Sequence, residues 1–502
     1  MSQPRSFARC VDVTGSPTPV AAVDLGATSG RVVVATLDRQ GIAIEEVARF
    51  PNGPVQASDG SWVWPLTTLY DAVVCALARA RDRGVTSWGI DSWGVDFGVV
   101  RDGALVGPVR AHRDPRHASG MAVVDEAMPW PTLYAHTGIQ RIAINTIYQI
   151  AAEDPRRIDA DCAVLMVPDL LAYWATGVLA SDVTDASTTG MVDPRTRQWS
   201  RPLLDALDLP PSAFLPLDEP GVIRGPATDP RVLGLDLIGV ATHDTASAFA
   251  GAPVQDRDRA LILSLGTWAL IGAEVVGAEP DDAARAANVT HELGVDGTVR
   301  VLGNVTGMWL LEECRRAWAL EDGTEPPIAD LVDAACRAKP LQAVFDVDNA
   351  GLAAPGQSEH TIARLLVGAH DGTRGAVVRS LLESMVVRLA QRADEIEALL
   401  GTPRPVLHVV GGASRIDPLM QWLADASGRE VVAGPVEATA IGNAVLQWRA
   451  LGVVHDLAAA RSIIGGMPQI RTFRPQGDHR AWAAFGERLA ERFDATRTDA
   501  PR

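Results

Sequence analysis

The chain has 502 residues, 47% of them hydrophobic, so it is long enough to bury two sizeable cores. Its 45 basic and 62 acidic side chains give a formal net charge of −17 at pH 7. An acidic surface repels phosphate backbones and anionic lipids, which argues against a nucleic-acid or membrane partner. No apolar run reaches the length of a membrane span, and the first 17 residues lack the apolar core of a signal peptide.

Five cysteines lie far apart and include no Cys-x-x-Cys pair, so neither a disulfide framework nor a zinc site is indicated. These observations predict a cytoplasmic protein with reduced thiols. They leave its oligomeric state open.

Lysine is almost absent, since Lys339 is the only one in the chain. A P-loop requires a lysine on the phosphates, and a protein kinase requires one on a strand. Lys339 fits neither motif, because Pro340 follows it directly and disfavours both helix and central strand. Any nucleotide is therefore expected to be held by backbone N–H groups, hydroxyls, arginine and a metal ion.

The first predicted element is a β-hairpin. The apolar run that ends at Asp24 enters a glycine turn, 26–30, that carries hydroxyl side chains, and a second apolar run, 32–35, leaves it. Glycine lets backbone N–H groups approach a ligand closely, and hydroxyls add donors for phosphate. Asp24 is either a turn former that bonds its own backbone or a ligand, direct or through water, of a Mg²⁺ bound to phosphate.

A third strand over 42–47, a helix over 66–80 and a strand-like segment over 88–97 follow, which together make an α/β unit. In the last segment Asp91 and Asp96 flank a glycine. Either carboxylate is suited to cap the strand end or to accept a sugar hydroxyl, and the pattern does not choose between them.

An apolar strand over 237–241 brings His243 and Asp244 to its end, and small residues follow, as at the start of a helix. On this pattern alone Asp244 is an N-cap, a common place for Asp. Its position between two phosphate-type turns makes a second interpretation about as strong. In that interpretation the carboxylate accepts a hydroxyl proton during phosphoryl transfer.

The second half of the chain repeats the plan of the first. A second hairpin turns at Gly266, and an amphipathic helix follows over about 376–400, with Gly401 as its C-cap. A buried strand over 406–410 then runs into a Gly-Gly turn ahead of another helix.

A strand, a glycine turn and a helix N-terminus together suit a nucleotide, because free N–H groups and the helix dipole attract phosphate. The repeated pattern predicts a duplicated α/β fold with domains 18–244 and 245–490 and a cleft between them.

These motifs together resemble the carbohydrate kinases of the FGGY family, in the actin-like ATPase superfamily, over about residues 20–475. The segments that carry the resemblance are 22–27, 89–97, 242–248, 266–268, 410–412 and 433–443. The resemblance implies two actin-like, ribonuclease H-like α/β domains.

The resemblance also implies roles for individual residues. Asp244 matches the general base on the sugar hydroxyl, and the implied substrate contacts are Gly94, His243, Thr245 and Asn304. The implied nucleotide contacts are Ala27, Thr28, Ser29, Gly30 and Arg31 in the first turn, Thr267 in the second and Gly412 at the adenosine. Glu312 departs from the pattern, because the best-matched members carry Gln there.

The implied reaction is phosphorylation of the primary hydroxyl of L-rhamnulose by ATP with Mg²⁺, so the expected partners are a small sugar and ATP. An apolar contact to the methyl group of this 6-deoxyketose discriminates by only about 1–3 kcal/mol, so fuculose, xylulose and other ketoses stay alternatives. A non-catalytic, ATP-sensing actin-like protein is a further alternative. The polar run 243–245 argues against it.

Overall fold

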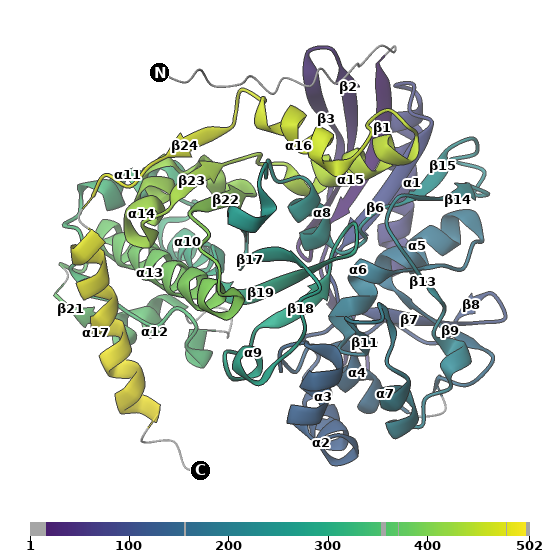
Figure 1. Ribbon diagram of the computed structural model, residues 1–502, viewed down its shortest axis with the longest axis horizontal. Helices are drawn as coiled ribbons and strands as arrows, with labels where there is room; N and C mark the ends of the chain where they lie inside the picture. Colours follow the sequence, from purple (N-terminus) through teal and green to yellow (C-terminus); the bar gives the residue numbers. More distant parts are fainter. Residues whose placement is uncertain (1–16, 155–156, 353–357, 370, 478, 498–502) are drawn as a thin grey trace.

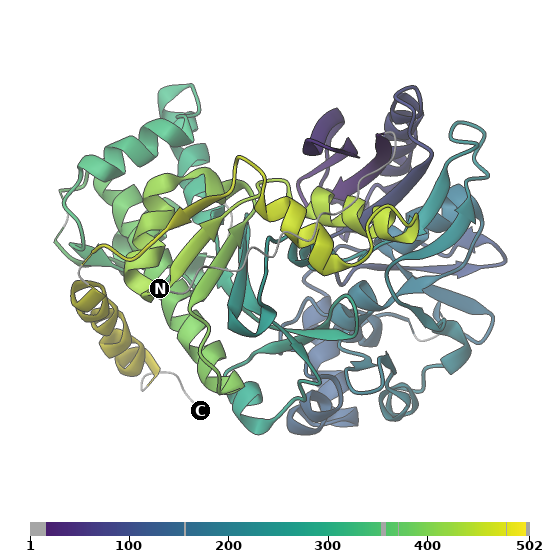
Figure 2. The ribbon, with the colours of Figure 1, turned by 45° about the horizontal axis from the view of Figure 1, so that its top comes forward.

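The computed structural model describes residues 17–154, 157–352, 358–369, 371–477 and 479–497. Two α/β halves lie side by side, one built mainly from the purple-to-blue part of the chain and the other from the green part (Figures 1 and 2). Of the first 17 residues, which were expected to lack a signal peptide, 1–16 lie outside the described residues. Within them, every helix lacks the length or the apolar character needed to cross a membrane, and the cysteines form no disulfide.

The N-terminal half is built on a six-stranded mixed sheet. Its strands in spatial order are β14 (Val222–Pro226), β15 (Asp236–Gly239), β6 (Ser87–Ser92), β1 (Thr18–Leu25), β2 (Ser29–Asp38) and β3 (Gly41–Pro51). β15, β6 and β1 run parallel to one another, whereas β1, β2 and β3 form an antiparallel meander. This confirms the predicted first hairpin and third strand.

The C-terminal half is built on a seven-stranded sheet. Its strands in spatial order are β18 (Thr290–Leu293), β19 (Thr298–Thr306), β17 (Trp268–Val276), β16 (Ala260–Leu265), β22 (Val406–Val410), β23 (Glu430–Ala433) and β24 (Arg471–Phe473). β16, β22 and β23 are parallel, and β16, β17 and β19 form an antiparallel meander.

The two sheets repeat one strand order with the same directions. β15, β6, β1, β2 and β3 of the first sheet correspond to β23, β22, β16, β17 and β19 of the second. α1 (Leu66–Arg81) and α13 (Arg374–Leu400) occupy equivalent places, each between the meander and the next parallel strand. The duplication predicted from the two glycine hairpins is therefore present in the fold.

These two helices form where their apolar residues recur at helical spacing. In α1, Leu69, Val73 and Leu77 are buried in one stripe, and basic residues in the last turn interact favourably with the negative end of the helix dipole. α13 ends where Gly401 takes a left-handed conformation with φ 66°, as the C-cap prediction requires.

One predicted element is wrong. The segment 88–97 is not a single strand, because β6 ends at Ser92 and the chain bends before β7 (Phe97–Arg101), which belongs to a different sheet with β8 (Ala104–Leu105) and β9 (Cys162–Met166). The physical cause is Val95, whose φ of 70° lies in the left-handed region and cannot continue a strand.

Further helices surround the sheets of both halves. In the N-terminal half they are α2 (His117–Ala127), α3 (Trp130–Thr137), α4 (Thr146–Ala151), α5 (Val167–Thr176), α6 (Val183–Ala186) and α7 (Arg201–Ala206). In the C-terminal half they are α9 (Asp282–Ala286), α10 (Trp309–Asp322), α11 (Ile328–Arg337), α12 (Ser358–Leu365), α14 (Asp417–Ser427), α16 (Leu457–Gly465) and α17 (His479–Arg497).

The halves are joined by α8 (Asp244–Ala250), which follows β15, and α15 (Ala438–Ala450), which follows β23. These equivalent helices pack so closely that a Cβ on Gly251 would overlap the carbonyl of Ala438, and one on Gly442 would overlap the carbonyl of Ser247. Glycine at this crossing therefore sets how near the two helices approach.

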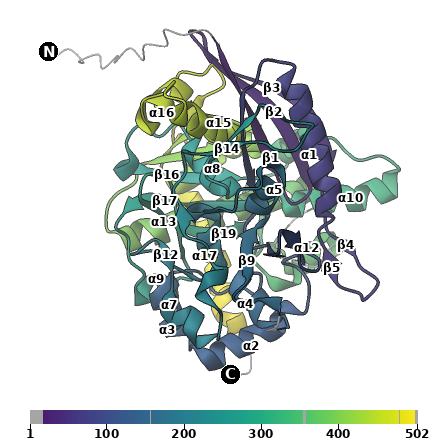
Figure 3. The same ribbon diagram turned by 90° about the vertical axis from the view of Figure 1, so that its right-hand side faces the viewer.

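α15 also covers the N-terminal sheet, as Figure 3 shows beside β1 and β2. Trp448 is fully buried there, and its indole N–H donates to the Thr18 carbonyl at 2.9 Å. Gln447 donates to the Ala21 carbonyl at 2.8 Å. A segment from the end of the chain is thus part of the core of the first half.

Candidate functional site

The candidate site lies where the parallel strands of the N-terminal sheet end. Asp24 of β1 is the register partner of Asp91 of β6, and Ser92 pairs with His243 in a parallel bridge. Ligands of open α/β sheets bind at such carboxyl ends. The predicted residues Asp24, His243 and Asp244 therefore come together at one edge of the sheet.

The first glycine turn is closed by its own backbone and by Asn52. Gly26 N donates to the Ser29 carbonyl at 3.0 Å, while the Asn52 side chain donates to the Gly26 carbonyl at 2.8 Å and its backbone N–H to the Thr28 carbonyl at 3.1 Å. Thr28 is exposed. Sequence reasoning did not single out Asn52, which comes directly after the third strand.

Asp24 pairs with Arg31, which leaves the turn on β2. The Arg31 Nη2 and Nε atoms donate to Asp24 Oδ2 at 2.6 and 2.9 Å, and Nη1 binds Glu437 from the C-terminal half. Burial alone lowers the pKa of Arg31, but the two carboxylates outweigh it and raise the value. Arg31 is thus a permanent cation that links the first turn to the other half of the molecule.

Asp91 is fully buried beside this pair. Asn443 of α15 donates to Asp91 Oδ2 at 2.6 Å, and Oδ1 has no hydrogen-bond partner. Burial, reinforced by the charge of Asp24, raises the pKa of Asp91 well above its ordinary value. Adjacent carboxylate oxygens, one of them unpartnered, are the donor set that Mg²⁺ prefers.

Asp244 is the first residue of α8, and His243 takes the N-cap position. Asp244 Oδ1 accepts a hydrogen bond from the Thr245 hydroxyl at 3.0 Å and lies 3.6 Å from His243 Nε2. Burial of the site raises the pKa of Asp244, His243 opposes the shift, and Asp24 adds to it. The N-cap interpretation of Asp244 is therefore wrong, and a carboxylate with one-third of its side chain exposed (33%) is left facing the site.

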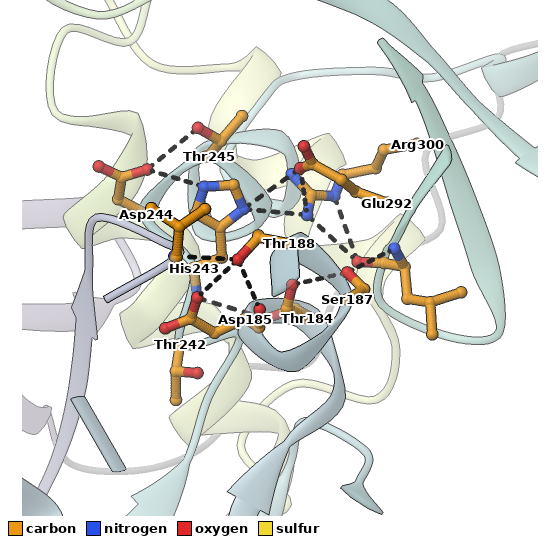
Figure 4. Close-up of polar contacts among 12 residues, drawn as sticks. Thr184, Asp185, Ser187, Thr188, Thr242, His243, Asp244, Thr245, Glu292 and Arg300 are labelled. Carbon is orange, nitrogen blue, oxygen red and sulfur yellow. Dashed lines mark hydrogen bonds and ion pairs between the residues drawn. The ribbon is translucent and has the colours of Figure 1, made fainter. Parts of the chain in front are cut away.

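The loop that precedes Asp244 is held by Asp182, a residue that the sequence analysis did not identify. Asp182 Oδ1 accepts hydrogen bonds from the backbone N–H and the hydroxyl of Thr242, each at 3.1 Å (Figure 4 shows the neighbouring contacts). His243 N donates to the Thr184 hydroxyl at 3.3 Å. Burial and the charge of Asp169 raise the pKa of Asp182 to about 6.

Gly94 is placed where only a glycine fits. A Cβ there would lie 2.9 Å from the Thr188 hydroxyl oxygen, which also accepts the backbone N–H of Val95 at 3.0 Å. Asp96, its neighbour, is occupied by protein donors, since Oδ2 accepts from Trp64 Nε1 at 2.7 Å and from Trp93 Nε1 at 2.8 Å. Asp96 Oδ1 in turn accepts from Gln149 Nε2 at 3.2 Å, so both oxygens of Asp96 are bonded to protein side chains.

The nucleotide residues predicted in the second half lie at equivalent strand ends. Gly266 N donates to the Trp268 carbonyl at 3.0 Å, which closes the second turn and leaves Thr267 exposed. At the end of β22, Gly411 has φ 93° and packs against the Leu265 carbonyl, while a Cβ on Gly412 would meet open space. These two glycine turns thus lie next to each other.

Two further predicted residues belong to the C-terminal half. Asn304 of β19 has a buried Oδ1 without a hydrogen-bond partner, an atom able to accept from a ligand. Glu312, whose contact with a nucleotide the sequence left open, has its charge paired with Arg315 Nη1 at 2.6 Å. Within the described residues, Thr267, Asn304 and Gly412 make no direct polar contact with Asp244.

Models of one protein family match nearly the whole chain. The N-terminal domain of the FGGY family of carbohydrate kinases matches residues 20–249, and its C-terminal domain matches residues 261–451.

Full-length relatives agree with the family models. A rhamnulokinase of Bacteroides thetaiotaomicron is 37% identical over 480 residues, covering 92% of this chain and 97% of that protein. A rhamnulokinase of Mannheimia succiniciproducens is 35% identical over 487 residues, covering 94% of this chain and 98% of that protein.

Solved structures share the fold. A ligand-bound xylulose kinase from Lactobacillus acidophilus matches with a TM-score of 0.79 at 18% identity, covering 96% of this chain and 99% of that chain. A glycerol kinase from Plasmodium falciparum, solved with ADP, matches with a TM-score of 0.78 at 15% identity, covering 97% of this chain and 99% of that chain. The predicted two-domain α/β architecture is confirmed by this likeness.

Proposed function

Because the chain belongs to the FGGY family of carbohydrate kinases, we propose that it transfers the γ-phosphoryl group of ATP to the primary hydroxyl of L-rhamnulose. The products are L-rhamnulose 1-phosphate and ADP. The choice of sugar is supported by the rhamnulokinases to which this chain is 34–37% identical. The observation that carries the chemistry is Asp244, a carboxylate held by Thr245 at the strand ends that also carry Asp24 and the first glycine turn.

In this proposal Asp244 is the general base. Its carboxylate accepts the proton of the primary hydroxyl while the hydroxyl oxygen forms a bond to the γ-phosphorus and the bond to the β,γ-bridging oxygen breaks. The raised pKa of Asp244 makes it a stronger base than an exposed Asp. Asp182 holds Thr242, and Thr184 holds the backbone of His243, which together fix the loop that precedes the base.

The nucleotide is proposed to lie between the first glycine turn, 26–30, and the second, at Gly266. Backbone and hydroxyl groups of Ala27, Thr28, Ser29 and Gly30 with the Arg31 side chain would bind phosphates from one side. Thr267 would bind them from the other side, and the open face of Gly412 would admit the adenosine.

Mg²⁺ fits this donor set, although no group of three or more ligands is preassembled among the described residues. Asp24, directly or through water, would hold the ion with help from Asp91, whose Oδ1 is unpartnered. Mg²⁺ usually keeps several waters and binds through one or two carboxylates plus substrate phosphates, and when bound it neutralises charge on those phosphates.

The sugar is proposed to contact Gly94, His243, Thr245 and Asn304. Asn304 Oδ1 is a buried acceptor that a sugar hydroxyl would satisfy. The missing side chain of Gly94 lets Thr188 pack against the backbone at this position. We further propose that the sugar-binding half is 18–244 and the half with the adenosine site is 245–490.

The experiment is an ADP-release assay with the purified chain, ATP and Mg²⁺ over L-rhamnulose, L-fuculose, D-xylulose and other ketoses. The highest kcat/KM is expected with L-rhamnulose. A higher kcat/KM with another ketose would reassign the sugar, and ATP binding without turnover on any sugar would favour the ATP-sensing alternative.

A further inference from the structure

The ring of His243 is held from behind by two charged residues of the C-terminal sheet. Arg300 Nη2 lies 3.1 Å from His243 Nδ1, and Glu292 Oε2 lies 3.4 Å from the same nitrogen and 3.2 Å from Arg300 Nη2 (Figure 4). Glu292 and Arg300 are direct cross-strand partners on β18 and β19. A residue beside the proposed base is therefore fixed by the opposite half of the molecule.

Hydrogen-bonding chemistry sets the proton position on this ring. A guanidinium has only donors, so an Arg300 N–H directed at Nδ1 requires Nδ1 to be the acceptor. The proton of the neutral imidazole then resides on Nε2, the nitrogen 3.6 Å from Asp244 Oδ1. Glu292, which has only acceptors when ionised, pairs with Arg300 and cannot form a hydrogen bond with an unprotonated Nδ1.

Arg300 is itself firmly placed. Its side chain is fully buried, its Nε and Nη2 atoms donate to the Leu293 carbonyl at 3.3 and 3.2 Å, and its guanidinium lies 5.9 Å from the Phe249 ring centre. Leu293 N in turn donates to the Ser187 hydroxyl of the N-terminal half at 2.9 Å. Arg300 therefore has few alternative positions from which to approach His243.

Glu292 keeps the cation in place. Burial tends to raise the pKa of Glu292, and the charge of Arg300 is the largest influence that lowers it. The net pKa lies below its ordinary value, so the carboxylate stays ionised. A buried guanidinium without a counter-charge is strongly disfavoured. The pair is thus a neutral unit whose free N–H group faces the imidazole.

We propose that Arg300, paired with Glu292, is a positioning residue that fixes His243 in the Nε2–H tautomer, with that N–H directed toward Asp244 and the bound sugar. The inference rests on the proposed function and says how one of its substrate contacts, His243, is oriented. At 3.6 Å the Nε2–H group is too far from Asp244 Oδ1 for a hydrogen bond, so it can donate to an oxygen of the sugar. Arg300 acts through His243 and does not touch the substrate.

The test replaces the whole pair, because a single substitution leaves a buried charge. Glu292→Met/Arg300→Met exchanges the ion pair for apolar side chains of similar length, a change that buried pairs often tolerate. The matched control is Arg379→Met/Glu383→Met, which removes another buried pair, on α13, whose Arg379 Nε and Glu383 Oε1 atoms lie 2.5 Å apart and which makes no hydrogen bond or ion pair with His243 or Arg300 in the described residues. His243→Ala provides the background for a double-mutant cycle.

With L-rhamnulose, kcat/KM of Glu292→Met/Arg300→Met is expected to fall about 10- to 100-fold, the effect that orienting partners of histidine have at metal sites. The control is expected to stay within about threefold of wild type, and in the His243→Ala background the same double substitution should cost less than about threefold further. An equal loss in both backgrounds would overturn the proposal, because it would show a structural role independent of His243.

The tautomer is read without substrate from ¹⁵N–¹H spectra of histidine-labelled protein, with the His243 signal assigned by its loss in His243→Gln. A proton on Nε2 in wild type that is no longer confined there in Glu292→Met/Arg300→Met supports the proposal. A proton on Nδ1 in wild type would overturn it, because Nδ1 would then donate to Glu292. This readout stays valid if no sugar is turned over, so failure of the proposed function is distinguishable.

Discussion

Asp244→Asn tests the proposed base with little change in shape. Asparagine keeps the Oδ1 atom, which in the wild-type chain accepts from the Thr245 hydroxyl at 3.0 Å and lies 3.6 Å from His243 Nε2. What it removes is the ability to accept a proton. The substitution also takes one negative charge from a site that holds Asp24 and Asp91, so it relieves repulsion and should not destabilise the fold.

The expected loss follows from the contribution of a positioned base. General base catalysis is worth about 10²- to 10⁴-fold, or about 3–5 kcal/mol of transition-state stabilisation, so kcat should fall by that factor. The dissociation constant of ATP should change less than about threefold, because it reports ground-state binding and the proposed base acts on the sugar hydroxyl in the transition state. ADP release measures kcat, and isothermal calorimetry measures ATP binding.

Asp82→Asn is the matched control, since Asp82 is exposed at the end of α1. It should leave both quantities unchanged. Turnover by Asp244→Asn within threefold of wild type would refute the base assignment. Loss of ATP binding together with turnover would refute it as well, because Asp244 would then hold the nucleotide site together.

Three other outcomes are expected. Because the pKa of Asp244 is raised and the base must be ionised, kcat/KM should fall with decreasing pH at a value above that of an ordinary Asp, and a pH–rate profile measures where. The pKa of Asp182 is about 6 in the folded chain and about 3.9 in the unfolded chain, so folding binds a proton between these values, and the contribution of this group to the free energy of unfolding falls by roughly 1–3 kcal/mol as the pH rises through them. Asp91 and Asp244 also have raised pKa values and add changes of their own, so the difference in urea stability between pH 4 and pH 7 should be smaller by this amount in Asp182→Asn than in wild type, and equal differences would contradict the shift. Gly442→Ala should cost about 1–3 kcal/mol by forcing α15 away from the Ser247 carbonyl, seen as a lower midpoint of thermal unfolding, whereas an unchanged midpoint would contradict the packing of the two helices.

The repeated hairpins, the long helices and the strand ahead of the Gly-Gly turn were predictable because each rests on a local pattern. Apolar spacing determines α1, and the apolar runs around Gly26 and Gly266 determine the two hairpins. The segment 88–97 was mispredicted because nothing in its composition shows that Val95 takes a positive φ.

The partners of the site residues were not predictable, since they come from distant parts of the chain. Asp24 was expected either to bond its own backbone or to bind metal, whereas in the fold it pairs with Arg31, which also binds Glu437 from 406 residues away. Asp182, on the two-residue strand β10 (Ser181–Asp182), and Arg300, on β19, are single charges with no motif around them. Only the strand order shows that they reach the loop that carries His243 and Asp244.

The central claim is tested most directly by the chemical structure of the product. The purified chain is incubated with ATP, Mg²⁺ and L-rhamnulose, and the product is examined by ³¹P–¹H correlation spectroscopy. The expected product is one phosphate monoester coupled to the methylene protons of C1, formed in equal amount with ADP. Phosphate on a secondary hydroxyl, or ADP formed together with inorganic phosphate and no sugar ester, would contradict it.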